Sequence, residues 1–243
     1  MSLFKSRELW STFCGKDESF DDKCMIVADV LGQGFECIVV GSHSGFLRIF
    51  QPEPDSECDA EGFRPTDLLI ETQLHQPVIQ VAVGKLVSGS QSVQVGVLHP
   101  RSFAVYSLVA ISGSAQHGDQ YDLVMAYEHQ LSRSAFSFVV GAFGGAKGRD
   151  FTCIHSLDGT LSFFEQETFA MSRSLPCFLL PSPFVYMPSS DSFVILNANW
   201  VLESYRYEVL ADTNRKLVAW WSLSLGEPIV DMKVVATQGT KSA

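Results

Sequence analysis

Four twelve-residue segments of this sequence each read as a strand, a turn and a second strand. They begin at Val39, Gly96, Cys153 and Ile195, so successive starts lie 57, 57 and 42 residues apart. Units that recur at intervals of about forty to fifty residues are characteristic of propeller blades. A small sheet cannot bury both of its faces alone, so such units must stack on one another. This periodicity constrains the fold more than any other feature of the chain.

Further strands complete each repeat. An apolar strand precedes the hairpins, as in "PVIQVAVGKLVSG" from Pro77, and an outer strand follows them, as in "TFAMSRSLPCFLL". No stretch carries the three-four apolar spacing of a long helix. We therefore predict an all-β chain, 1–243, of four-stranded propeller blades at 22–76, 77–131, 132–176 and 177–228, with the start of a fifth at 229–243. Because a lone strand would leave an exposed edge, we expect an incomplete propeller and a longer chain.

The stretch "GAFGGAKGRD", Gly141 to Asp150, resembles at first sight a loop that cradles a nucleotide phosphate. Such a loop needs a hydroxyl residue after its lysine and a helix behind it, but Gly148 follows Lys147. The next residues, "FTCIHSLDGTLSFF", have the alternation and the Asp-Gly pair of a hairpin. The sequence therefore predicts a tight turn between the first and second strands of a blade. "GKLVSGS" occupies the same place one blade earlier.

Composition narrows the classes of partner. An apolar content of 46% is sufficient for a buried core. A net charge of −10 disfavours nucleic acid, because phosphate binding requires clustered Lys and Arg. No apolar run reaches the roughly 18 to 20 residues of a membrane helix, and the N-terminus lacks the apolar core of a signal peptide, so we expect a cytosolic protein. The scattered cysteines predict reduced, mostly buried thiols: Cys14, Cys24, Cys37, Cys58, Cys153 and Cys177.

Residues that could carry chemistry are isolated from one another in the sequence. The histidines are spaced without any metal-ligand pattern: His43, His75, His99, His117, His129 and His155. The composition is compatible with a Ser-His-Asp catalytic triad, but the sequence has no G-x-S-x-G elbow that would locate the nucleophile. The adjacent Asp158 and Gly159 depart from the aspartate box of sialidase propellers and predict a type I′ turn. We predict no catalytic, cofactor-binding or metal-binding residues.

One loop is similar to the calcium loop of integrin-type propellers. In "ADVLGQGFECIVVGSHSGFLRIF", only Asp29 remains as a carboxylate, and Leu31 and Gln33 occupy other ligand positions. Calcium prefers about six to eight oxygen ligands, several of them charged, so a structural turn is the preferred interpretation.

Aromatic and basic residues are the remaining candidates for binding elements. Trp10, Trp200, Trp220 and Trp221 and the eighteen phenylalanines lack interleaved basic residues, so we expect them to fill the spaces between blades rather than to stack on bases. Arg133, Lys147 and Arg149 form a small basic patch, for which a solvated turn is the preferred interpretation over contact with a lipid phosphate or an acidic partner.

Several segments together resemble the N-terminal region of the Bardet-Biedl syndrome 9 (parathyroid hormone-responsive) protein family. They include "MSLFKSRELWST", "VGSHSGFLRIFQP", "YEHQLSRSAF", "GAFGGAKGRDFTCIHSLDGTLSFFEQE", "SLPCFLLPSPFVY" and "VLESYRYEVLA". They occur in order over nearly the whole chain. The resemblance implies part of a seven-bladed propeller in a non-enzymatic scaffold subunit of the BBSome, a coat-like complex that carries membrane proteins to and from primary cilia and supports ciliogenesis.

The same resemblance implies partners and location. The expected partners are other BBSome subunits, with ciliary cargo and membrane reached only indirectly, and with no nucleic acid, cofactor or small-molecule substrate. The implied locations are the cytoplasm, cilium, ciliary membrane, basal body and centriolar satellites. Two alternatives stay open: a propeller enzyme of unknown substrate, and a calcium-dependent propeller of the integrin type. The apolar inner strands, such as "VIQVAVG" and "FSFVVGAF", disfavour the enzyme.

Overall fold

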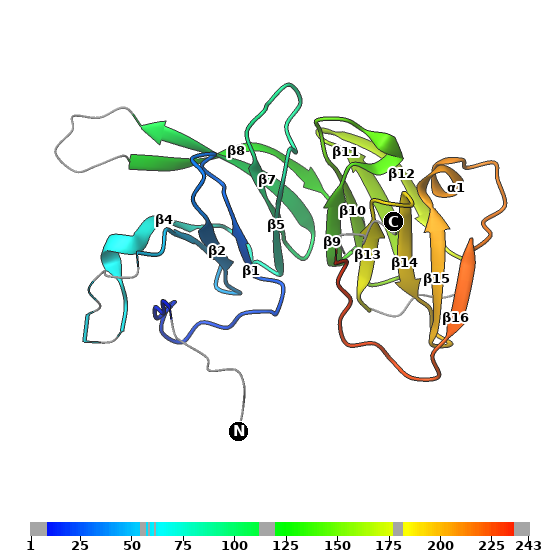
Figure 1. The fold of residues 1–243 in the computed structure, drawn as a ribbon, viewed down its shortest axis with the longest axis horizontal. Coiled ribbons are helices and arrows are strands. Elements are labelled where there is room, and N and C mark those ends of the chain that lie inside the picture. The colour runs from blue at the N-terminus through cyan, green and yellow to red at the C-terminus, as the bar shows by residue number, and fades with distance from the viewer. Residues whose placement is uncertain are drawn as a thin grey trace, which may run out of the picture. The chain divides into compact units, whose positions relative to one another are not determined.

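The computed structural model describes residues 9–53, 57, 59, 60, 62–111, 120–176 and 182–235. These residues form four antiparallel sheets of four strands each, and the strands of every sheet follow chain order (Figure 1). Within the described residues the helical elements are short: η1 (Pro65–Asp67), η2 (Phe143–Gly145) and α1 (Tyr207–Ala211). The predicted fold class, all-β with four-stranded blades of an incomplete propeller, is confirmed. No helix in the described ranges is long and apolar enough to cross a bilayer.

The chain divides into two compact units, residues 1–130 and 131–243. The first unit holds two sheets: β1 (Met25–Ala28), β2 (Cys37–Gly41), β3 (Phe46–Phe50) and β4 (Leu68–Gln73), then β5 (Gln80–Gly84), β6 (Gln94–Leu98), β7 (Ser102–Ile111) and β8 (Gln120–Gln130). The second unit holds β9 (Ala135–Gly141), β10 (Phe151–Ser156), β11 (Thr160–Glu165) and β12 (Thr168–Ser174), then β13 (Phe184–Met187), β14 (Ser192–Leu196), β15 (Val201–Arg206) and β16 (Trp221–Ser224).

The four repeated segments coincide with the second and third strands of the four sheets. They are the hairpins β2–β3, β6–β7, β10–β11 and β14–β15. Local sequence suffices for this result, because alternating apolar residues around a turn define a hairpin without reference to distant contacts. In the region predicted to begin a fifth blade, residues 229–235 carry no strand, and 236–243 lie outside the described residues.

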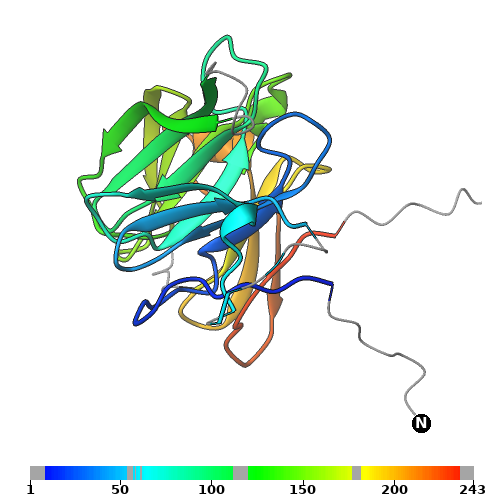
Figure 2. The same cartoon turned by 90° about the vertical axis from the view of Figure 1, so that its left-hand side faces the viewer.

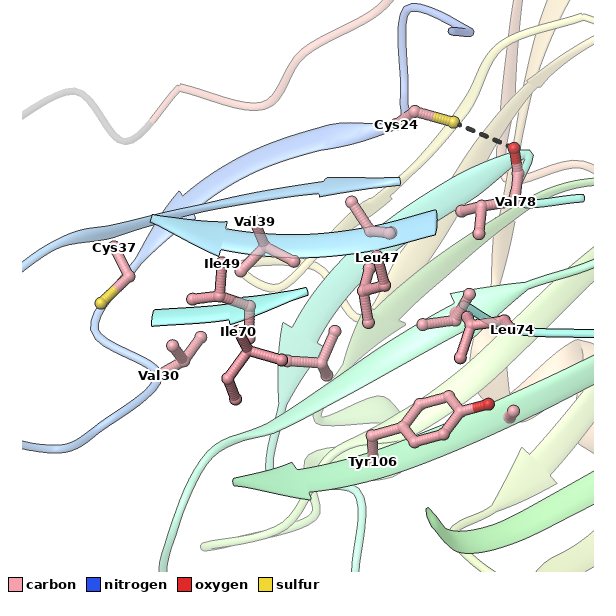
Figure 3. Close-up of a cluster of buried hydrophobic side chains, with 14 residues drawn as sticks. Cys24, Val30, Cys37, Val39, Leu47, Ile49, Ile70, Leu74, Val78 and Tyr106 are labelled. Carbon is pink, nitrogen blue, oxygen red and sulfur yellow. Dashed lines mark hydrogen bonds between the residues drawn. The ribbon is translucent and has the colours of Figure 1, made fainter. Parts of the chain in front are cut away.

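The first unit is held together by an aliphatic core between its two sheets (Figure 3). Val39 of β2 and Leu47 and Ile49 of β3 are each 0% exposed and share this core with Val78, which lies just before β5. At Gly41 a Cβ atom would lie only 2.4 Å from a methyl carbon of Val78, so the two sheets approach closely there. Burying each large aliphatic side chain contributes about 1.5 to 3 kcal/mol.

The second unit has an aromatic core between its two sheets. Phe163 of β11, Phe193 of β14 and Phe143 of η2 are at most 1% exposed, and their rings meet edge to face. The Phe163 and Phe193 centroids are 5.4 Å apart. Such edge-to-face pairs add about 0.5 to 1.5 kcal/mol beyond the area they bury. The expectation that phenylalanines fill the spaces between sheets is confirmed for these residues.

The hairpin turn at Asp158 and Gly159 differs from the predicted type I′ turn. Gly159 has a φ of 80°, but Asp158 does not take a positive φ, as type I′ requires. The Gly159 N–H donates to the Ser156 carbonyl over 2.9 Å, which closes a type I turn ahead of a left-handed glycine. A three-residue connection between β10 and β11 selects this geometry, whereas type I′ belongs to two-residue connections.

Candidate functional site

The glycine-rich stretch from Gly141 to Asp150 connects β9 to β10, as predicted for a turn between the first and second strands of a sheet. It also performs a role that the sequence did not indicate. Its Phe143 inserts into the aromatic core, with ring centroids 4.6 Å from Tyr186 and 4.9 Å from Phe193. The Gly144 N–H donates to Asp191 Oδ1 over 3.0 Å. The stretch therefore fastens the third sheet to the fourth.

His43, His99 and His155 serve local structure. His43 lies between the Ser19 hydroxyl, 3.1 Å from Nδ1, and Asp21 Oδ2, 3.0 Å from Nε2. Hydrolase triads instead place serine at Nε2 and aspartate at Nδ1, so the ring nitrogens are reversed here. His99 is buried with Nδ1 2.8 Å from the Pro77 carbonyl, and burial lowers its pKa. His155 packs between the rings of Phe136 and Phe184, and His117 lies outside the described residues.

The Asp29 carboxylate is occupied by hydrogen bonds from the protein backbone. Its oxygens accept hydrogen bonds from the N–H groups of Gly32, Gln33 and Gly34 at 2.7, 3.2 and 2.8 Å. These bonds, that from Gly34 first, lower the pKa of Asp29. Within the described ranges no group of three or more His, Cys, Asp or Glu side chains could hold a metal ion. Asp29 thus stabilises a turn before β2.

The cysteine thiols are free where the structure describes them: Cys14, Cys24, Cys37 and Cys153. Cys24 donates to the Val78 carbonyl over 3.3 Å, and burial raises its pKa to about 11 (Figure 3). Burial also raises the pKa of Cys153 well above its ordinary value. Thiols held in the neutral form are poor nucleophiles and metal ligands, so Cys24 and Cys153 act as small core side chains. Cys58 and Cys177 lie outside the described residues.

The tryptophans correct one expectation. Trp200, Trp220 and Trp221 are 42%, 51% and 36% exposed, so they do not fill the spaces between sheets.

Of the predicted basic patch, Arg133 is paired with Asp158. Arg149 places its guanidinium 5.0 Å from the Phe151 ring centroid, and Lys147 is exposed.

A surface suited to binding lies on the face of the first sheet that points away from the aliphatic core. Met25 and Val27 of β1 are 62% and 50% exposed there and pair with Val40 and Ile38 of β2. Side chains alternate between faces along a strand, so these four residues share one face. We call Met25, Val27, Ile38 and Val40 the outward patch.

The segment before β1 covers the rest of this face (dark blue in Figure 2). Trp10 Nε1–H donates to the buried Asp67 carboxylate over 2.6 Å, and its ring lies 5.9 Å from that of Phe50. Between segment and sheet is a mostly apolar cavity of about 390 Å³, lined by Trp10, Thr12, Cys14, Phe20, Asp21, Asp22, Cys24, Met25, Ile38, Val40 and Phe50. Sequence reasoning missed this segment because residues 9–22 form no strand or helix with a detectable period.

An ion-pair network fixes the segment to the sheet. The Arg48 guanidinium of β3 donates to both carboxylate oxygens of Glu18, at 2.7 and 3.0 Å, and through Nε to Glu71 at 2.6 Å. The Arg48 and Glu18 side chains are only 7% and 8% exposed. Hydrogen bonds from Arg48 lower the pKa of Glu18, and those to Glu18 raise the pKa of Arg48. A bidentate pair shielded from water holds a defined geometry, so the cavity has a rigid wall.

Comparison with known proteins gives one family. A family described as PTHB1 N-terminal matches residues 1–243. Similar sequences include Protein PTHB1 of Xenopus laevis, 46% identical over 99% of this chain and 30% of its own length, and Protein PTHB1 of Homo sapiens, 42% identical over 100% of this chain and 29% of its own length. A crystal structure of BBS1N in complex with ARL6DN aligns with a TM-score of 0.47 and 11% identity, over 95% of this chain and 78% of that one. The chain thus spans about 30% of the length of these relatives.

Proposed function

The chain belongs to the PTHB1 N-terminal family, and from this premise we propose that it is a protein-interaction part of a BBSome-type assembly without a reaction of its own. The observation that carries the proposal is the outward patch beside its apolar cavity. Exposed apolar surface on a rigid sheet marks a place where another protein binds. The aliphatic side chains of the patch can contribute binding energy but no chemistry of their own.

The finer proposal follows the resemblance to the Bardet-Biedl syndrome 9 family. The protein would act as a scaffold subunit of the BBSome in the transport of membrane proteins to and from the primary cilium. Its partners would be other BBSome subunits, and its locations would be the cytoplasm, the basal body with centriolar satellites, and the cilium with its membrane. The acidic net charge of −10 supports protein partners rather than nucleic acid.

The proposal is tested by recovery of the assembly from ciliated cells. The full-length protein that contains this chain is tagged, and co-purified proteins are identified by mass spectrometry. We expect wild type to recover other BBSome subunits and Met25→Glu with Val27→Glu to recover fewer. The matched control is Val109→Glu with Ile111→Glu, which places two charges on strand β7 at residues 47% and 48% exposed.

The two pairs of variants separate the possible results. Loss of subunits with the β1 pair and retention with the β7 pair would support the outward patch as an interface. Equal recovery with both pairs would remove the patch from the proposal. Recovery of no BBSome subunit with wild type would refute the assignment itself.

A further inference from the structure

A basic groove lies between the end of β15, the helix α1 and the loop that leads into β16. It has a volume of about 350 Å³, and its charged lining consists of Arg206, Arg215, Lys216 and Glu208. Val209, Val218 and Trp220 supply the apolar lining. The lining holds three cations and one carboxylate, so the groove is positively charged. The chain as a whole has a net charge of −10. The predicted basic patch at Arg133, Lys147 and Arg149 does not contribute to it.

The fold holds the walls of this groove in place. Arg173 of β12 donates to the carbonyl oxygens of Asp212, Thr213 and Arg215 at 3.0, 3.3 and 3.3 Å, which fixes the loop that carries Arg215. On the opposite wall the Arg206 guanidinium lies 4.4 Å from the Trp220 ring centroid. The backbone N–H of Trp220 donates to the Ser204 carbonyl over 2.7 Å. Because the walls of the groove are already held in place, less conformational entropy is lost when a partner binds.

The carboxylates near the groove do not cancel its charge. Glu208 lies 3.9 Å from Arg206 and is 67% exposed, so this pair is a weak one in water. The Asp212 carboxylate accepts a hydrogen bond from the Asn214 N–H over 3.0 Å and does not line the groove. Arg215 and Lys216 are both exposed. Their positive charge is therefore accessible to an anionic partner, which charge complementarity favours.

Strand β16 begins directly after Trp220, which lines the groove. β16 is the last strand of its sheet, and all four of its residues, Trp221 to Ser224, are exposed. Among the described residues only β15 pairs with it, so its other edge has no strand partner. Natural proteins commonly protect such edges with charged residues, but "WSLS" contains none. An extended peptide can add to a free edge through main-chain hydrogen bonds.

We propose that the basic groove and the free edge of β16 together bind an extended acidic peptide segment of a partner protein. The backbone of the peptide pairs with β16, and its carboxylates meet Arg206, Arg215 and Lys216. Apolar side chains of the peptide contact Val218 and Trp220, which are 62% and 51% exposed. This inference deepens the proposed function, because it names the chemistry of one partner.

Fluorescence anisotropy tests the inference on the full-length protein. The probe is a short labelled peptide that alternates glutamate with valine, and the control probe replaces glutamate with lysine. We expect Arg215→Glu with Lys216→Glu to weaken binding of the acidic probe at least about tenfold, because both cations line the groove. Binding should also weaken when salt rises from about 0.05 to about 0.5 M. Lys147→Glu with Arg149→Glu makes the same change of net charge elsewhere in the second unit and should leave affinity within about twofold.

Several results would overturn the inference. They are failure of wild type to bind the acidic probe, equal loss with both pairs of variants, or equal affinity for the lysine probe. A parallel sedimentation assay uses vesicles of phosphatidylserine and phosphatidylcholine. If the vesicles bind and the acidic peptide does not, the groove recognises a membrane and the peptide proposal is wrong. If the acidic peptide does not bind, we still expect the full-length protein to recover other BBSome subunits. The proposal of peptide binding can therefore fail while the proposed function stands.

Discussion

At the scale of single residues, Phe143 is the clearest case in which the surrounding sequence does not indicate that the side chain is buried. Phe143 sits among four glycines in a stretch that reads as a surface turn, yet it is 1% exposed. Its neighbour Gly141 has no room for a side chain, since a Cβ would lie 2.6 Å from Tyr186. The glycines let the main chain approach the fourth sheet closely enough for Phe143 to enter the aromatic core.

Phe143→Ala should lower the free energy of unfolding by about 3 to 5 kcal/mol, because it empties a tightly packed site between two sheets. Urea denaturation measures the change. Phe169→Ala, at a residue that is 54% exposed, is the matched control and should cost no more than about 1 kcal/mol. Equal costs at both positions would mean that Phe143 does not fasten the sheets.

Gly45 provides a second test at this scale. It has a φ of +85° in the β2–β3 turn, and a Cβ would lie 2.7 Å from the Leu74 carbonyl oxygen. Gly89 has a φ of +75°, and a Cβ added there would meet nothing within 4 Å. Gly89→Ala should cost about 1 to 2 kcal/mol from backbone strain alone. Gly45→Ala should cost more in the same denaturation experiment, since main-chain oxygen cannot move aside. A smaller cost at Gly45 would contradict the packing described.

At the scale of elements, the segment before β1 acts as a strap over the first sheet. Its contacts are long-range in sequence: Trp10 and Asp67 are 57 positions apart, and Glu18 and Arg48 are 30 apart. Because it lacks a ladder of backbone hydrogen bonds to β1, it depends on a few polar anchors and on ring packing with Phe50. The strap, the outward patch and the cavity form one structural element.

Arg48→Ala should lower the free energy of unfolding by about 3 to 5 kcal/mol, because it leaves the Glu18 carboxylate shielded from water without its cation. Limited proteolysis should also show faster cleavage within residues 9–24. Arg133→Ala removes an exposed partner of Asp158 and should cost less than about 1 kcal/mol. If the two variants proved equally mild, the strap would not depend on this network.

The same network predicts a dependence on pH. Arg48 lowers the pKa of Glu18 in the folded state, so the stabilisation is present above the unfolded pKa of about 4.3. It is lost as pH falls through the lower folded-state pKa, because protonated Glu18 no longer pairs with Arg48. Proteolysis of residues 9–24 with an acid-active protease should therefore accelerate below about pH 4. Glu18→Gln should reduce the pH dependence of this cleavage, and an unchanged profile would contradict the assignment.

At the scale of the whole molecule, each unit is a pair of stacked sheets with its own core. The first core is aliphatic and the second is aromatic. Neither core contains a cluster of acids, bases or nucleophiles among the residues described. Each unit is therefore organised around apolar packing, which leaves strand edges, outward faces and turns as its accessible surfaces.

Calcium should not change the melting temperature by more than about 1 °C, because the loop with the integrin-like pattern already uses its Asp29 carboxylate for three backbone hydrogen bonds. Differential scanning fluorimetry with calcium and with EDTA gives the comparison, and magnesium controls for ionic strength. A rise of several degrees with calcium alone would revive the calcium-dependent alternative.

The sequence by itself determined the order and pairing of the strands in the four described sheets, although the strand expected for a fifth blade is absent from residues 229–235. Alternation of apolar residues and the turns between them are local properties, so the four hairpins and the turn at Gly141 to Asp150 could be predicted. The prediction of a type I′ turn was wrong because one extra residue in the connection changes the favoured geometry.

Only the tertiary structure decided which side chains are buried and which surfaces are open. Phe143 is buried and Trp220 is exposed, although hydrophobicity alone would rank them alike. The strap and its cavity depend on pairs such as Trp10 with Asp67, and the basic groove depends on Arg173 reaching the loop at 212–215. These outcomes could not be predicted because burial and charge clustering arise from contacts between distant segments, whereas strand formation follows from the alternation of neighbouring residues.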